Sequence, residues 1–227
     1  MTQKTAVIFG ATGLTGSHLL TQLLDAQNYQ TVVAYTRREL EVVHDKLVSH
    51  VQPLEKITAE SLSDLPDQLD VFICLGTTIA KAGSKDAFKK VDYFLPLKLV
   101  NLLKEKTSHF LLISSLGADA NSGSFYLSVK GQLEIDLRVL DINRLTIFRP
   151  SLLKGDRKEK RFAEGLSLKL SGLVTPIFSL NFMKKYRPTD SQDLAKAMYK
   201  VASEEVGLSN ARTNVISSDM ITDLLTP

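Results

Sequence analysis

Three residues in the middle of the chain have the types and the spacing needed for proton transfer. Tyr126 and Lys130 lie four positions apart in a segment with helical spacing, so their side chains share one helix face. A tyrosine has a reference pKa near 10, but an adjacent ammonium favours the phenolate, so Lys130 would let Tyr126 exchange a proton at neutral pH. Ser115 follows a predicted strand and would hydrogen-bond the same substrate oxygen, with Ser114 as the alternative if the register differs by one. The alternative explanation of the Tyr126–Lys130 spacing is an amphipathic helix with a half-buried tyrosine and no catalytic role.

A second group of residues, near the N-terminus, is suited to holding a pyrophosphate. The segment Gly10-Ala11-Thr12-Gly13-Leu14-Thr15-Gly16 follows a predicted strand and opens a predicted helix. Glycines allow positive φ and close backbone approach, and the free N–H groups and dipole of a helix N-terminus attract anions. We therefore expect a dinucleotide to be bound here, by Gly10, Thr12, Gly13, Leu14, Thr15 and Gly16. A glycine-rich turn without a ligand is the alternative.

Two arginines indicate which nicotinamide cofactor is preferred. Arg37 and Arg38 follow the second predicted strand, and Arg37 lies 21 positions after Gly16. An acidic residue at this place accepts hydrogen bonds from a ribose 2′-hydroxyl, whereas arginine accommodates a 2′-phosphate. Guanidinium groups bind phosphate through charge-assisted hydrogen bonds. NADP(H) is therefore predicted, with solvated surface arginines as the alternative.

The elements that must position these groups alternate between strand and helix. Short β-branched and apolar runs predict strands at 5–9, 31–35, 48–52, 71–75, 110–113, 145–148 and 213–216. Helical spacing covers 17–26, 84–106, 125–140 and 191–202, with a kink or break at Pro96 and a cap at Thr189-Asp190. This order predicts an α/β fold, a doubly wound parallel sheet of the NAD(P)-binding Rossmann type.

The chain offers no linker at which it could be divided. We therefore expect one domain over 1–227, with the core sheet and cofactor site in 1–150. Residues 151–227 would supply the segments of a small C-terminal substrate-covering lobe and the final strand. The charged stretch 154–161 reads as a solvated loop, and the apolar stretch 162–182 as the wall of an apolar substrate pocket.

Composition excludes several classes of protein. Hydrophobic residues make up 44% of the chain and charged residues 23%, which excludes a disordered or fibrous protein. The 28 basic and 25 acidic residues are too balanced for a nucleic-acid footprint. Four scattered histidines and the single Cys74 suggest no metal site and no disulfide framework. Without a secretory signal or a long apolar run, a cytoplasmic protein without membrane attachment is expected.

Taken in order, these features resemble the short-chain dehydrogenase/reductase superfamily, extended or atypical branch, whose members share a Gly-x-x-Gly-x-x-Gly turn and a Ser…Tyr-x-x-x-Lys set. The chain resembles in particular the HIV Tat-interacting oxidoreductase family, over about residues 4 to 200. The blocks that carry this likeness are Arg37-Arg38, Cys74-Leu75-Gly76-Thr77-Thr78 with Lys81-Ala82-Gly83, Val91-Asp92, Ser114-Ser115-Leu116-Gly117-Ala118, Tyr126-Leu127-Ser128-Val129-Lys130-Gly131 and Phe148-Arg149-Pro150. The resemblance implies bound NADP(H), with Leu75, Gly76 and Thr77 near the adenosine half and Pro150, Ser151 and Leu152 near the nicotinamide. It implies no defined substrate. Human members of the family also have regulatory roles through protein partners, but no motif in this chain indicates a partner surface, so those roles are not carried over.

Three functions compete on these grounds. The first is an NADP(H)-dependent oxidoreductase acting on a small carbonyl or alcohol, with Ser115, Tyr126 and Lys130 as catalytic residues. The second is a redox sensor or scaffold that binds the dinucleotide without turnover, which loss of Tyr126 or Lys130 would have favoured. The third, an NAD-dependent sugar epimerase or dehydratase, predicts an acidic residue where Arg37 stands.

Overall fold

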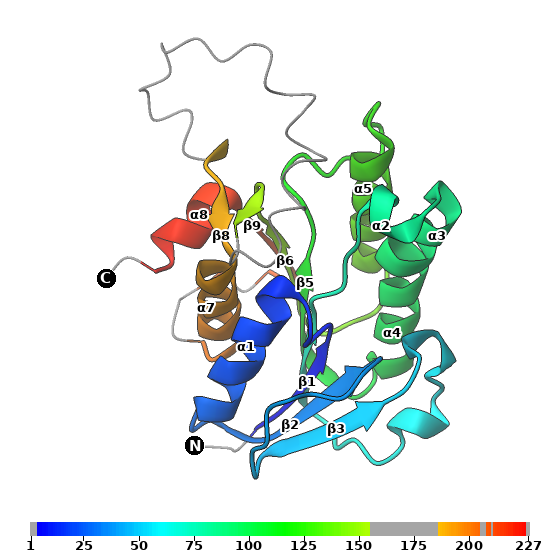
Figure 1. Cartoon of the computed structure of the whole chain (residues 1–227). Coiled ribbons are helices and arrows are strands. Elements are labelled where there is room, and N and C mark those ends of the chain that lie inside the picture. The colour runs from blue at the N-terminus through cyan, green and yellow to red at the C-terminus, as the bar shows by residue number, and fades with distance from the viewer. Residues whose placement is uncertain (1–3, 155–185, 205–207, 210, 226–227) are drawn as a thin grey trace.

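One parallel sheet forms the centre of the molecule. The computed structural model describes residues 4–154, 186–204, 208–209 and 211–225 (Figure 1). All neighbouring strands of the sheet are parallel, in the order β3-β2-β1-β4-β5-β6-β9. Their bounds are β1 (Lys4–Phe9), β2 (Tyr29–Thr36), β3 (Leu47–Val51), β4 (Leu69–Ile73), β5 (Thr107–Ile113), β6 (Leu145–Arg149) and β9 (Thr213–Ser217). Each strand was predicted to within a few residues, and the doubly wound fold is confirmed.

Helices cover both faces of the sheet (Figure 1). The helices α1 (Leu14–Asp25), α7 (Ser191–Ala202) and α8 (Ser218–Asp223) pack on one face, and α4 (Leu95–Leu103) and α5 (Phe125–Arg138) on the other. Ala6 and Ile8 of β1 enter the first core, whereas Val7 and Phe9 enter the second. Burial on both faces explains why these strands read as continuous apolar runs.

The region with helical spacing over 84–106 is divided just before Pro96, where a kink or break was predicted. It consists of α3 (Lys85–Lys89), a π turn η3 (Lys90–Phe94) and α4. The irregularity precedes Pro96, because proline has no N–H to donate to the carbonyl four residues earlier. Just before the proline, the Leu95 N–H bonds to the carbonyl of Lys90, five residues back, and not to the carbonyl four residues back as in an α-helix.

The remaining elements are short, and most were not predicted. They are α2 (Ile79–Ala82), the 3₁₀ turns η1 (Leu54–Lys56) and η2 (Glu60–Leu62), and the parallel pair β7 (Leu153–Lys154) and β8 (Thr189–Asp190). The predicted cap of α7 is confirmed, since the Asp190 side chain accepts a hydrogen bond from the Gln192 N–H at 2.8 Å. Most of the charged loop and the whole apolar stretch assigned to the lobe lie outside the described residues. No helix among those described is long and apolar enough to cross a bilayer.

A buried histidine in β5 makes stability depend on pH. His109 is 4% exposed and its Nε2 lies 2.8 Å from the Thr146 hydroxyl. Burial, together with the charges of Arg144 and Lys4, lowers the pKa of His109 to about 3. Unfolding restores a pKa near 6.5, so the contribution of neutral His109 is complete above that pH and is lost as the pH falls toward 3.

We therefore expect the free energy of unfolding to fall below pH 6.5, with a slope from this residue approaching about 1.4 kcal/mol per pH unit. Denaturant unfolding of His109→Gln between pH 7 and 5 should show a weaker pH dependence than the unaltered protein. The control is His18→Gln, at a partly exposed position in α1. Equal slopes in the unaltered protein and His109→Gln would contradict the prediction.

Candidate functional site

The predicted site segments collect at one edge of the sheet. Because the strands are parallel, their carboxyl ends share this edge, and the order β2-β1-β4 places a topological switch point between β1 and β4. Open α/β sheets bind ligands at such a point. The segments that meet there are the glycine turn after β1, residues 37–38 after β2, 75–77 after β4, 114–115 after β5 and 150–152 after β6.

The glycine turn is packed too closely for side chains at two positions. Gly10 has a φ of +92°, and a Cβ there would lie 2.5 Å from the Cys74 carbonyl oxygen at the end of β4. A Cβ on Gly16 would overlap the Gly10 carbonyl oxygen. These contacts bring the start of α1 directly onto the ends of β1 and β4.

The start of α1 fits an anionic group. Gly13 provides no side-chain cap, and the first turn contains no acidic residue. The Thr15 hydroxyl is buried and has no hydrogen-bond partner among the described residues. Free N–H groups, a helix dipole and an orphaned hydroxyl together make the site suitable for a pyrophosphate.

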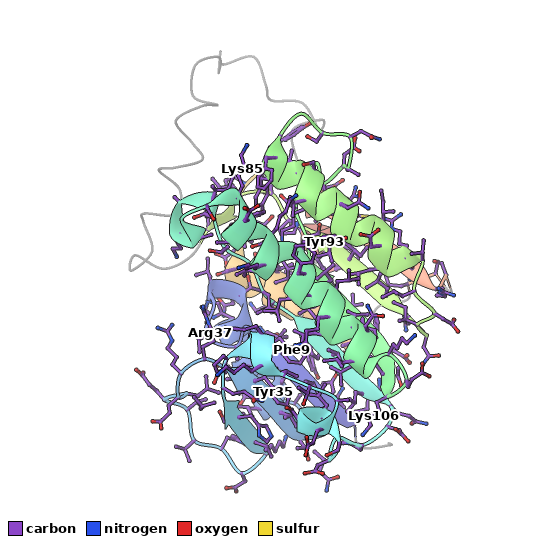
Figure 2. All side chains as sticks on the ribbon, turned by 90° about the vertical axis from the view of Figure 1, so that its right-hand side faces the viewer. Phe9, Tyr35, Arg37, Lys85, Tyr93 and Lys106 are labelled. Atoms are coloured by element: carbon purple, nitrogen blue, oxygen red, sulfur yellow. The ribbon has the colours of Figure 1, made fainter. Side chains whose placement is uncertain are left out.

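The two arginines stand next to this turn. Phe9 of β1 pairs with Tyr35 of β2, so Arg37 emerges beside the glycine turn (Figure 2). Both arginines are exposed. The Thr36 hydroxyl donates a hydrogen bond to the Arg38 carbonyl at 2.7 Å and so shapes the loop.

Lys130 is buried with a carboxylate as its direct partner. Lys130 is 3% exposed, and its Nζ lies 2.8 Å from Oδ1 of Asp92, which is fully buried. Burial alone would lower the pKa of Lys130, but the charges of Asp92 and Tyr126 raise it above its usual value. Tyr126 is half-buried, with its ring 5.5 Å from that of Phe88. Lys130 therefore stays protonated next to the tyrosine.

The structure separates the two candidate serines. The buried Ser114 hydroxyl donates to Glu134 Oε1 at 2.5 Å and is therefore committed to that carboxylate. Ser115 is half-buried, and within the described part of the chain its hydroxyl makes only a long 3.4 Å hydrogen bond to the Leu116 carbonyl. The following loop reaches α5, where the Asp119 N–H donates to the Leu127 carbonyl at 3.2 Å. Of the two serines, Ser115 thus has the less engaged hydroxyl.

A charged network that was not predicted lies beneath this site. Glu134 is 2% exposed, and Arg149 holds it at 2.6 Å through Nη2 and at 3.0 Å through Nε. Arg138 adds a second cation, whose Nη2 lies 3.4 Å from Glu134 Oε2. The network ties the ends of β5 and β6 to α5. The sequence did contain a signal for this network, because Glu134 lies one helical turn after Lys130, at a position whose spacing predicts burial.

The remaining residues predicted to contact the cofactor differ in which hydrogen bonds they already make within the protein. The Thr77 N–H donates to Asp92 Oδ2 at 2.9 Å, so the 75–77 turn is tied to the partner of Lys130. The Leu116 N–H donates to the Pro150 carbonyl at 2.8 Å, which extends the β5–β6 pairing past both strands. The Ser151 hydroxyl donates to the Arg187 carbonyl and so is engaged within the protein, whereas Leu152 is exposed. The described residues contain no group of three potential metal ligands.

Solved structures share this fold. One is MoeE5 in complex with UDP-glucuronic acid and NAD, with a TM-score of 0.67 and 18% identity over 94% of this chain and 75% of that one. Another is a putative NAD-dependent epimerase/dehydratase from Bacillus halodurans, with a TM-score of 0.63 and 20% identity over 89% of each chain. At such identities the likeness shows the fold alone.

Relatives in sequence are closer. Protein HTATIP2 of Rattus norvegicus is 38% identical over 177 residues, which are 76% of this chain and 72% of the relative. Protein FMP52 of Candida glabrata is 32% identical over 228 residues, 98% of this chain and 90% of the relative. Several FMP52 relatives are named mitochondrial, which contradicts the cytoplasmic location expected from the sequence. The lack of a secretory signal argues only against secretion and does not distinguish the cytoplasm from the mitochondrion.

The model of the HIM1 family matches residues 36–183, more than half of the chain. It spans the arginine loop, both serines and the Tyr126–Lys130 pair. The resemblance found in the sequence is confirmed by this match and by the HTATIP2 and FMP52 relatives, and the solved structures confirm the fold. The chain belongs to the HIM1 family, is of the HTATIP2 type and has the doubly wound fold of the solved structures above.

Proposed function

We propose that this protein is an NADP(H)-dependent oxidoreductase that transfers a hydride between the nicotinamide and a small carbonyl or alcohol. The observation that carries the proposal is the meeting of two features at one sheet edge. One is the uncapped start of α1 with its orphaned Thr15 hydroxyl. The other is the protonated, buried Lys130 beside Tyr126, with the Ser115 hydroxyl in the neighbouring loop.

Each residue has a distinct role in this proposal. When bound, a nicotinamide dinucleotide would supply or accept the hydride at the substrate carbon. Tyr126 gives its Oη proton to the substrate oxygen during reduction and takes it back during oxidation. Lys130 favours the tyrosinate by its charge and would hold the nicotinamide ribose, and Ser115 hydrogen-bonds the substrate oxygen.

Arg37 supports a preference for NADP(H). Replacing Arg37 with alanine should weaken NADPH binding by about 10-fold to 100-fold, because a charge-assisted hydrogen bond to the 2′-phosphate contributes about 1.5 to 3 kcal/mol. NADH binding should change little. Calorimetric titration of both cofactors measures this difference.

The control is Lys104→Ala, which removes the same charge just after the end of α4, toward the opposite edge of the sheet. If the unaltered protein binds NADH as tightly as NADPH, the assignment of the arginines is wrong.

A screen of aldehydes, ketones and quinones that follows NADPH absorbance tests the activity. The proposed enzyme consumes NADPH with at least one compound. Tight NADPH binding without turnover throughout the screen would favour the alternative, a dinucleotide-binding redox sensor or scaffold. An epimerase or dehydratase would instead prefer NAD, against the position of Arg37.

We also propose a mitochondrial location, which the names of the FMP52 relatives support. Fractionation of cells expressing the tagged chain tests it.

A further inference from the structure

The carboxylate that faces Lys130 comes from an unusual piece of backbone. Asp92 lies in the π turn η3, between α3 and α4. Such turns are uncommon and frequently occur at functional sites. Although Asp92 is charged, it is 0% exposed. A charge is buried at this depth only where partners offset the loss of water.

Each oxygen of Asp92 faces a different part of the site. Oδ1 lies 2.8 Å from Lys130 Nζ, and Oδ2 accepts the Thr77 N–H at 2.9 Å. A Cβ built on Gly76 would lie 3.6 Å from Oδ1, so the turn after β4 passes directly along the carboxylate. Asp92 therefore connects the lysine of α5 with the turn predicted to contact the cofactor.

Asp92 is the main counter-ion of the Lys130 ammonium. The titratable groups that act on Lys130 are Asp92 from η3 and Tyr126 and Glu134 from α5. Glu134 is held by Arg149 and Arg138, which offset its charge. Only Asp92 makes an ion pair with Lys130 among the described residues.

We propose that Asp92 is a positioning residue for proton transfer: it holds Lys130 protonated next to Tyr126 and ties that ammonium to the Gly76–Thr77 turn. This inference rests on the proposed function, because it assigns Asp92 to the Tyr126–Lys130 pair. The same carboxylate would then support both the turn that contacts the cofactor and the lysine that acts on the tyrosine.

Asp92→Asn keeps the shape of the side chain but removes its charge. A buried ammonium without its counter-ion loses its proton more readily, since an opposite charge in contact shifts a pKa by about 1 to 3 units. In the variant, Lys130 should therefore titrate at least about one pH unit lower than in the unaltered protein. NMR titration of the Lys130 side chain, assigned by its absence in Lys130→Met, measures this without cofactor or substrate.

The matched control is Asp86→Asn, at an exposed position in α3. In this control, Lys130 should titrate at the same pH as in the unaltered protein. An unchanged Lys130 titration in folded Asp92→Asn overturns the inference. This readout does not depend on dinucleotide binding, so failure of the proposed function would appear separately, as no cofactor binding in the unaltered protein.

A pH profile separates positioning from a merely structural role. With any substrate that the carbonyl screen identifies, the reduction rate of Asp92→Asn should begin to fall at a pH at least about one unit lower than that of the unaltered protein, because Lys130 loses its proton there. A loss that is equal at all pH values overturns the positioning role.

If Asp92→Asn does not fold, a stability cycle still tests the pairing. Asp92→Asn combined with Lys130→Met removes both charges and should be more stable than Asp92→Asn alone, because breaking a buried ion pair leaves an uncompensated charge. A double variant that is no more stable than the single one overturns the inference.

Discussion

Replacing Tyr126 with phenylalanine should abolish turnover while leaving NADPH affinity nearly unchanged. The change removes only the Oη atom, and the ring can keep its contact with Phe88. Proton transfer by a positioned side chain typically contributes about 100-fold to 10,000-fold in rate. We therefore expect kcat to fall by at least about 100-fold with the substrate found by the carbonyl screen. Calorimetry with NADPH should give a dissociation constant within about 3-fold of the unaltered protein, well under the factor of ten that 1.4 kcal/mol represents.

The control for this variant is Tyr199→Phe. Tyr199 lies in α7, on the other face of the sheet, where its hydroxyl donates to Asn28 at 3.3 Å. This variant should retain activity. Full turnover in Tyr126→Phe would show that another group exchanges the proton. Equal losses in both variants would point to general damage to the fold.

Replacing Gly16 with alanine should disable the cofactor site. The added Cβ would overlap the Gly10 carbonyl oxygen, which belongs to backbone and cannot rotate away. Gly10 cannot retreat either, because it already packs against the end of β4. The start of α1 must therefore move away from the turn, which misplaces the N–H groups that face the pyrophosphate.

We expect Gly16→Ala to weaken NADPH binding by about 100-fold, which corresponds to about 3 kcal/mol. Overpacking should also cost about 1 to 3 kcal/mol of stability. Calorimetric titration and denaturant unfolding measure the two effects. Gly123→Ala is the matched control, since nothing lies within 4 Å of its added Cβ. Unchanged NADPH affinity in Gly16→Ala would mean that the dinucleotide binds elsewhere.

The sequence by itself determined the strands and the glycine turn. The apolar runs were sufficient because strands buried on both faces leave a continuous local pattern. The glycine turn was recognisable because the demand for small residues at Gly10 and Gly16 is met within one short segment. The spacing of Tyr126 and Lys130 was equally local, since one helix carries both.

Pairings between distant segments depended on the tertiary structure. Asp92 is 38 positions from Lys130 and 15 from Thr77, and their contacts exist only because η3 packs against α5 and the β4 edge. The choice between Ser114 and Ser115 likewise depended on Glu134, which is 20 residues away. Such contacts leave no periodic trace, because they arise from how whole elements pack and from where a proline displaces the helical bonding. Local spacing thus specified the elements and the residue types, and packing decided which charges and hydroxyls meet.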